Sequence, residues 1–137
     1  MKEKIEYNID VDEFLEMVNS VGWKSYTHLQ IEKALQNTMY MMKIIVDDEI
    51  AGMGRVVGDY SIVCILTDIC VKPKFQERGI GTKIVMELKR MIEKNIAKGE
   101  KIQIELTPTS GKEKFYERSG FKYKPDKMTG MYLWIEK

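Results

Sequence analysis

The chain has 137 residues, 31% of them charged, and its formal net charge is +1. This length is typical of one domain with a core of its own, and we expect residues 1–137 to form it. The balanced charge provides no strong field for nucleic acid, and no apolar stretch is long enough to span a membrane. Because Met1–Lys4 also lacks the apolar run of a signal peptide, we expect a cytoplasmic protein that binds neither nucleic acid nor membrane.

A short strand and two helices are predicted at the start of the chain. Alternating apolar and polar residues predict a strand over residues 4–9. Asp10 with Glu13, and Thr27 with Gln30, have the spacing of two capping boxes, and an apolar stripe at helical spacing follows each of them. We therefore expect two amphipathic helices that begin at these caps.

Three strands are predicted next. Residues 39–46 and 50–57 are separated by an acidic turn, and Gly58–Asp59 begins the following turn. Residues 62–71 are almost continuously apolar and β-branched, which is typical of a central strand covered on both faces. Pro73 marks the end of that strand. These segments predict an antiparallel meander that leads into the central strand.

The two cysteines lie in the predicted central strand. Cys64 and Cys70 are separated by roughly 20 Å if the strand is extended, which excludes a disulfide between them. No set of His and Cys residues completes a metal site, so we expect no metal. Both cysteines are expected to be buried, reduced thiols.

A glycine-containing loop joins the central strand to a long amphipathic helix. Gly79 and Gly81 precede apolar residues at helical spacing, and Lys98–Gly99 are expected to end the helix. The first N–H groups of a helix lack partners within it, and the helix dipole makes that end positive. The loop is therefore a candidate site for phosphate or pyrophosphate. A nucleotide P-loop is excluded, because Gly81-Thr82-Lys83 does not follow the order that this motif requires.

The last part of the chain is expected to complete the sheet. Residues 102–107 alternate as a half-buried strand, which should run parallel to the central strand because the long helix joins the two. A short helix over residues 112–119 is predicted to end at Gly120. Two final strands are expected at 121–124 and 131–135.

The order of these motifs resembles that of the GNAT superfamily of acyl-CoA-dependent N-acetyltransferases. The segment Gln76-x-x-Gly79-x-Gly81, after a strand that ends in Val-x-Pro, matches the family signature Q/R-x-x-G-x-G/A. Phe115-Tyr116-x-x-x-Gly120-Phe121 follows in family order, and the resemblance spans residues 40–135. It implies an α/β (α+β) fold with a mixed, mostly antiparallel sheet. The sheet should be splayed between two parallel strands and should carry helices on both faces.

The resemblance also implies an activity. We expect direct transfer of the acetyl group of acetyl-CoA to a primary amine of a small molecule or a protein. The chain has one histidine and no nucleophile elbow, which argues against a Ser-His-Asp set and agrees with transfer that forms no covalent enzyme intermediate. The alternative is a non-catalytic acyl-CoA-binding regulatory module on the same fold. The resemblance leaves a homodimer open.

By the same resemblance, Tyr116 is expected to be the general acid that protonates the departing thiolate. Relatives carry a base at positions that correspond here to Ile65 and Thr67, so Asp68 and Glu105 are the nearest acidic candidates. A water relay, or binding of the neutral amine, is an equal alternative. The residues expected to hold acetyl-CoA are Ile69, Cys70, Val71, Gln76, Glu77, Arg78, Gly79, Ile80, Gly81, Thr82, Lys112 and Phe115. Cys70 is expected to lie close to the thioester, so a covalent role for its thiol is an alternative to a buried, unreactive one.

The residues that would bind the acceptor amine are indicated less clearly by the sequence than those that would bind acetyl-CoA. In GNAT proteins the early helices wall the acceptor pocket, so residues near the second helix are either acceptor contacts or anchors of the helices. Arg55 either binds an anionic part of the acceptor or is an edge charge. The other candidates are Trp23, Tyr26, His28, Tyr60 and the loop Met128-Thr129-Gly130-Met131. His28 is expected at the surface.

Overall fold

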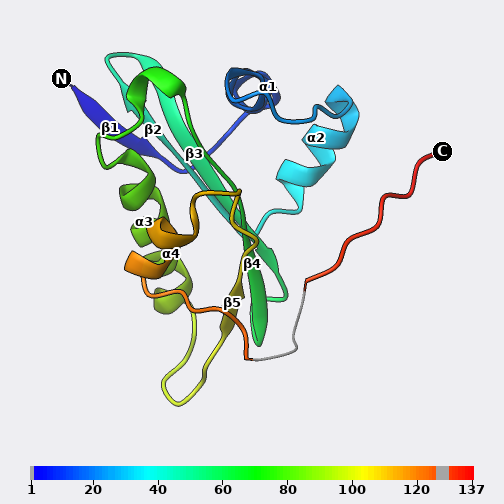
Figure 1. Cartoon of the computed structure of the whole chain (residues 1–137), viewed down its shortest axis with the longest axis vertical. Helices are drawn as coiled ribbons and strands as arrows, with labels where there is room; N and C mark the ends of the chain where they lie inside the picture. Colours follow the sequence, from blue (N-terminus) through cyan, green and yellow to red (C-terminus); the bar gives the residue numbers. More distant parts are fainter. Residues whose placement is uncertain (1, 126–129) are drawn as a thin grey trace. The chain divides into compact units, whose positions relative to one another are not determined.

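A computed structural model describes residues 2–125 and 130–137 of the chain. The chain forms two compact units, Met1–Leu106 and Thr107–Lys137. Figure 1 traces the elements of each unit in chain order. No helix of the described residues has the length and apolar character needed to cross a membrane.

The first unit contains a five-stranded sheet whose strands lie in sequence order. The first four strands pair antiparallel, and the last two pair parallel. This arrangement confirms the predicted mixed sheet (Figure 1). The strands are β1 (Glu3–Glu6), β2 (Tyr40–Val46), β3 (Glu49–Gly58), β4 (Val63–Val71) and β5 (Gln103–Glu105).

Local sequence explains the two turns of the meander. Asp47 and Asp48 both have positive φ, 48° and 65°, as a two-residue hairpin turn between β2 and β3 requires. After β3, the Oδ1 atom of Asp59 accepts hydrogen bonds from the backbone N–H groups of Ser61, Ile62 and Val63. Acidic residues therefore occupy both turns, as the sequence predicted, and the Asp59 side chain stabilises the second of them.

The two early helices begin where the capping boxes predicted them. In α1 (Val11–Ser20), Asp10 Oδ1 accepts from the Glu13 N–H at 2.8 Å. In α2 (His28–Gln36), Thr27 Oγ1 accepts from the Gln30 N–H at 3.2 Å. Both boxes are complete, since each third-position side chain also accepts from the backbone of its cap residue.

Helices cover both faces of the sheet (Figure 1). The helix α3 (Ile80–Lys94) packs closely on β3, where a Cβ added to Gly54 would lie 2.7 Å from Ile84 Cγ2. On the opposite face, the Cys70 thiol donates to the Met17 carbonyl of α1 at 3.5 Å. Glycine in β3 thus lets α3 approach the strand, and the prediction of helices on both faces is confirmed.

A hydrophobic cluster fills the space between α1, α2 and the sheet. The predicted strand over residues 4–9 is too long, because β1 pairs with β2 only as far as Glu6. The chain then leaves the sheet, and Ile9 is buried in this cluster. Burial under the helices therefore replaces strand pairing at the end of this segment. The buried members of the cluster are Ile9, Phe14, Met17, Val18, Ile31, Leu35, Ile45, Ile50, Met53 and Cys70.

The predicted end of α3 at Lys98–Gly99 is wrong. The helix ends at Lys94, and Asn95 caps it by donating from Nδ2 to the Met91 carbonyl at 2.7 Å. This side chain satisfies a carbonyl that would otherwise lack a partner at the helix end. Gly99 does adopt a positive φ of 88°, but it does so in the turn that follows.

The second unit contains one short helix, α4 (Glu113–Arg118), within its described residues. The helix ends in a Schellman motif: the Phe121 N–H donates to the Tyr116 carbonyl and the Gly120 N–H donates to the Glu117 carbonyl. Gly120 has a φ of 97°, so it is the glycine that follows the cap residue Ser119. The prediction that this glycine ends the helix is correct to within one position.

The two final strands predicted at 121–124 and 131–135 are wrong, because the structure has no strand in either segment. Alternation predicts a strand only where one face of the segment becomes buried. Here the neighbouring residues Met131, Tyr132 and Leu133 are 94%, 89% and 83% exposed, so neither face is buried. The loop predicted between these strands includes residues 126–129, which lie outside the described part of the chain.

Candidate functional site

The two parallel strands are open to each other beyond a short paired segment. The strand β5 pairs with β4 only from Val63 to Ile65. No strand of the described residues pairs with that edge of β4 from Leu66 to Val71. The predicted splay between the parallel strands is therefore confirmed.

The backbone of the open segment has hydrogen-bonding groups that face away from β3. The Lys72 N–H donates to the Ala51 carbonyl of β3 at 2.8 Å. Because backbone groups alternate in direction along an antiparallel strand, those of Val71 point toward the open edge. Ile69 lies where β4 departs from regular pairing, and it has no register partner in β3. An extended ligand that carries amides can pair with such an edge in the manner of a strand.

A loop and a helix begin at the end of β4. The loop contains a 3-10 turn, η1 (Pro73–Phe75), and the Gln76 side chain donates from Nε2 back to the Val71 carbonyl at 3.0 Å. Two residues predicted to bind the ligand therefore contact each other, and this bond ties the loop to the strand. The Val71 carbonyl keeps a second lone pair for another donor.

The N-terminus of α3 is available to an anion. Its cap residue Gly79 has a φ of 79°, and no side chain caps the helix. The first turn contains no acidic residue, and open space lies where a Cβ of Gly79 would be. The backbone N–H groups of Ile80, Gly81 and Thr82 begin a 15-residue helix. Uncapped N–H groups at the positive end of a helix suit a phosphate or pyrophosphate.

Two further predicted residues lie in the loop before this helix. Glu77 has a positive φ of 63°, and both Glu77 and Arg78 are exposed. The guanidinium of Arg78 lies 5.7 Å from the ring centre of Phe75, and the Lys74 ammonium lies 5.2 Å from the same ring. The Lys74 ammonium is also paired with Glu49 at 2.6 Å. Arg78, which directly precedes the cap residue Gly79, is therefore the cation of the two that we expect to add to the attraction for an anion.

The strand β4 contains a bulge at Asp68. Pairing with β3 passes from Met53 opposite Cys70 to Arg55 opposite Thr67, so β4 has one more residue than β3 in this interval. Asp68 has a φ of 56° and accepts from Arg55 Nε at 2.5 Å. The candidate base is therefore held in an ion pair, in which the side chains of Arg55 and Asp68 are only 16% and 22% exposed.

Burial governs the chemistry of the cysteines. Cys64 and Cys70 are both free and buried, as predicted. Burial, with a smaller contribution from the charge of Asp68, raises the pKa of the Cys70 thiol to about 12. Burial also raises the pKa of Cys64. At neutral pH both groups are protonated and poorly nucleophilic, which argues against the covalent role considered for Cys70.

The candidate general acid and its predicted neighbours lie in the second unit. Lys112 is the cap residue of α4, and the rings of Phe115 and Tyr116 pack edge-to-face at 4.9 Å. Phe121 packs on the other side of the motif, 6.0 Å from the Tyr116 ring, so the Schellman motif fixes this aromatic cluster. Burial raises the pKa of Tyr116 above its usual value of 10.0, so the phenol keeps its proton at neutral pH.

The candidate acceptor residues have differing environments. Trp23 packs against the hydrophobic cluster, in agreement with an anchoring role. His28 is the first residue of α2 and is exposed, as predicted, and Tyr26 is 43% exposed. Tyr60 packs edge-to-face on Tyr40 at 5.9 Å. Met128 and Thr129 of the predicted loop lie outside the described residues.

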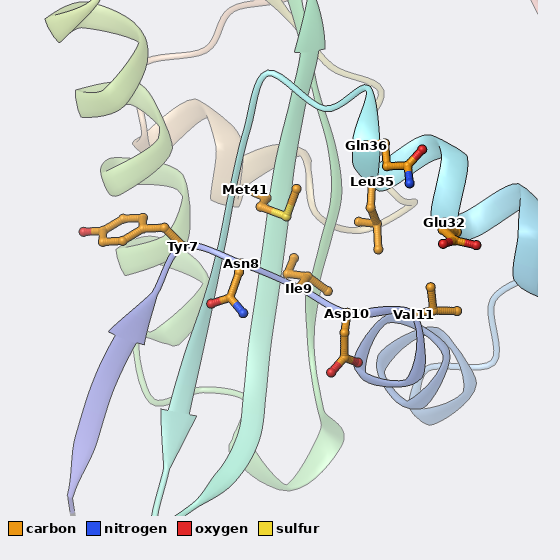
Figure 2. Close-up of a pocket in the computed structure, with 9 residues that line it drawn as sticks. All are labelled: Tyr7, Asn8, Ile9, Asp10, Val11, Glu32, Leu35, Gln36 and Met41. Carbon is orange, nitrogen blue, oxygen red and sulfur yellow. The ribbon is translucent and has the colours of Figure 1, made fainter.

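Sequence reasoning missed a cavity of about 340 Å³ beside α2. Figure 2 shows its lining, which comes from the segment between β1 and α1, from the first residue of α1, from α2 and from β2. Tyr7 points away from α2 (Figure 2), and its hydroxyl donates to Glu87 of α3 at 2.9 Å. The cavity depends on distant segments meeting, so no local signal could have indicated it. Its lining residues are Tyr7, Asn8, Ile9, Asp10, Val11, Glu32, Leu35, Gln36 and Met41.

Comparison with known proteins agrees with this arrangement. The chain is 25% identical over 129 residues to the uncharacterized N-acetyltransferase ycf52 of Pyropia yezoensis, covering 91% of this chain and 72% of that protein. It is 25% identical over 150 residues to GCN5-related N-acetyltransferase 2, chloroplastic, of Arabidopsis thaliana, and the match covers 94% of this chain and 56% of that protein. A solved structure of SA2161 from Staphylococcus aureus, described as a probable acetyltransferase, matches this chain with a TM-score of 0.88 at 24% identity. The match covers 98% of this chain and 100% of that one.

The family model of the acetyltransferase (GNAT) domain matches residues 7–130. That match includes the open strand β4, the glycine loop and the start of α3, together with the aromatic cluster of the second unit. It spans most of the 137 residues. The chain therefore belongs to the GNAT family of acetyltransferases.

Proposed function

We propose that the protein transfers the acetyl group of acetyl-CoA directly to a primary amine of a small molecule or of a protein. One observation carries this proposal: an unpaired strand edge at the end of β4 leads, through a short loop, into an uncapped helix N-terminus. The first feature suits an extended chain with amides, and the second suits a pyrophosphate. Coenzyme A contains both parts in one molecule.

The residues of the first unit divide between these two parts. We assign the backbone groups of Ile69 and Val71 to the pantetheine arm, because those of Val71 face the open edge of β4 and Ile69 has no register partner in β3. The N–H groups from Arg78 to Thr82 are assigned to the pyrophosphate. Gln76 supports both regions through its hydrogen bond to Val71. When bound, acetyl-CoA supplies an activated thioester whose carbonyl carbon an amine can attack.

Attack on a thioester places negative charge on its oxygen, and a backbone N–H is a suitable donor to that oxygen. Cys70 lies opposite Met53 of β3, whereas Ile69 has no register partner in β3. We therefore assign this role to the Ile69 N–H. The assignment narrows the earlier expectation, which left both residues open.

We assign the proton for the departing thiolate to Tyr116. Support comes from its raised pKa, since a general acid must hold its proton at working pH. For the base, we favour a water or uptake of the neutral amine, because Asp68 is already engaged by Arg55. An acceptor that reaches the site uncharged still loses one proton from its nitrogen as the amide forms. Water can carry that proton to the Tyr116 phenolate, which has given its own proton to the thiolate.

Two measurements test the proposal. Calorimetry with coenzyme A tests binding, and a screen of amines, peptides and aminoglycosides with acetyl-CoA tests transfer by following the free thiol. We expect micromolar binding and thiol release that depends on one class of amine. Binding without release by any amine would favour the regulatory module, and absence of binding would overturn the site. The cytoplasmic location and the homodimer stay predictions.

A further inference from the structure

The bulge of β4 is held by side chains from two other elements. Arg55 of β3 donates from Nε to Asp68 Oδ2 at 2.5 Å and from Nη1 to Thr38 Oγ1 at 3.0 Å. The Thr38 hydroxyl in turn donates to the Ala34 carbonyl of α2 at 2.8 Å. A continuous set of hydrogen bonds thus joins the bulge to the C-terminal end of α2.

This network surrounds a backbone conformation that its residue does not favour. Asp68 has a φ of 56°, in the left-handed region that residues with a Cβ seldom occupy, although Asp and Asn do so more readily than most. A conformation of this kind persists only where its surroundings hold it. The side chains of Arg55 and Asp68 are only 16% and 22% exposed, so water competes weakly with their ion pair.

The position of Asp68 connects this network to the reaction. The peptide unit between Asp68 and Ile69 carries the Ile69 N–H, and the backbone dihedrals of Asp68 set its direction. That N–H is the donor assigned above to the thioester oxygen. A flip of the peptide unit between Asp68 and Ile69, in which ψ of Asp68 and φ of Ile69 rotate in opposite senses, would turn the donor without moving the rest of β4.

We propose that Arg55, Asp68 and Thr38 are positioning residues that hold the β4 bulge and thereby aim the Ile69 N–H at the thioester oxygen. The inference rests on the proposed function for its catalytic consequence, but the conformational part stands on the hydrogen bonds alone. It replaces the expectation that Asp68 removes a proton from the amine. The side chain acts on the reaction through the backbone.

Three substitutions of Asp68 separate positioning from proton removal. Asn retains a side-chain acceptor for Arg55 and tolerates positive φ, Gly tolerates positive φ without a side chain, and Ala does neither. If Asp68 is a positioning residue, kcat should be highest in Asp68→Asn, lower in Asp68→Gly and lowest in Asp68→Ala. We expect a loss within about tenfold for Asn and on the order of 10²-fold for Ala, comparable to loss of an oxyanion donor. KM for acetyl-CoA should change less than threefold.

Proton removal by Asp68 predicts a different pattern. All three variants would then lose activity to the same extent, and the pH profile of kcat/KM would lose its lower limb. Asp68→Gly leaves the Arg55 guanidinium without its carboxylate, so the pair Asp68→Gly with Arg55→Met is also needed. We expect the double variant to be at least as active as Asp68→Gly alone, because removing both partners leaves no unpaired buried charge.

The matched control is another ion pair of low exposure, between Lys43 of β2 and Glu13 of α1 at 2.7 Å. Glu13→Gln breaks this pair while keeping the capping box, and Lys43 is two strands away from β4. We expect it to lower thermal stability but to keep kcat within twofold. Equal loss of kcat in Glu13→Gln and Asp68→Ala would show a general stability effect and would overturn the inference.

A readout without turnover separates this inference from the proposed function. In NMR spectra of the protein without ligand, the chemical shift of the Ile69 amide should change strongly in Asp68→Ala and little in Asp68→Asn. An unchanged Ile69 amide in Asp68→Ala would overturn the positioning role even if the enzyme transfers acetyl groups. If the wild-type protein neither binds coenzyme A nor releases thiol, the proposed function fails, while the NMR comparison still decides whether the network holds the bulge.

Discussion

Substituting Gly81 by Asp should affect stability and ligand binding in opposite directions. Gly81 is the second residue of α3, a helix whose first turn has no acidic residue and no side-chain cap. An acidic residue there interacts favourably with the helix dipole, by about 0.3–1 kcal/mol, and replacing glycine in a helix adds a contribution of similar size. We therefore expect Gly81→Asp to keep or raise the melting temperature of the protein.

The same carboxylate should oppose the pyrophosphate of coenzyme A. Two unit charges in contact at about 4 Å interact by about 1 kcal/mol in bulk water and by about 4 kcal/mol at the effective dielectric of a protein surface. The pyrophosphate presents two charges, so the smallest expected loss is about 2 kcal/mol. This corresponds to a rise in Kd of about 30-fold.

Calorimetry with coenzyme A measures this loss, and Gly99→Asp is the matched control. Gly99 lies beyond the other end of α3, a helix about 22 Å long, and open space lies where its Cβ would be. Its φ of 88° strains any side chain, although Asp adopts such a conformation more readily than most residues, so the comparison uses the Kd of the folded protein. The control has the same change in charge, and its Kd should stay within twofold of wild type. A folded Gly81→Asp protein with unchanged Kd would refute the assigned pyrophosphate site. An equal rise in both variants would mean that net charge, rather than the helix N-terminus, controls binding.

Three other changes test separate parts of the molecule. Tyr116→Phe should lower kcat about 100-fold with little change in coenzyme A affinity, and a twofold loss would make Tyr116 a packing residue. Because the pKa of Tyr116 is raised above 10.0, wild-type kcat should show no alkaline decline from this group below pH 10, since the proton leaves only as the pH rises through that raised value. Gly54→Ala would place a Cβ 2.6 Å from Ile69 Cδ1, and urea unfolding should show a loss of about 1–3 kcal/mol; unchanged stability would contradict close packing there. A thiol reagent at pH 8 should label Cys64 and Cys70 only after denaturation, and rapid labelling of the native protein would contradict their burial and the pKa of about 12 for Cys70.

The segments that were predicted well depend on short-range interactions. The capping boxes at Asp10 and Thr27 each join residues three positions apart, and they begin helices where they were expected. The acidic turn after β2 and the glycine that follows α4 likewise act through neighbouring backbone groups. The end of α3 was predicted poorly, because the side chain of Asn95 competes with Gly99 as a stop signal.

The sequence by itself determined the order of elements as far as α4, the helix N-caps, the glycine loop and the family, because each of these depends on residues that are close along the chain. Only the tertiary structure decided the extra residue in β4, the partner of Asp68 and the cavity beside α2. Arg55 and Asp68 are 13 positions apart, and they meet only because β3 and β4 pair in one register. Register depends on packing across the whole sheet, so the local pattern that predicts each strand contains no record of which side chains will face each other.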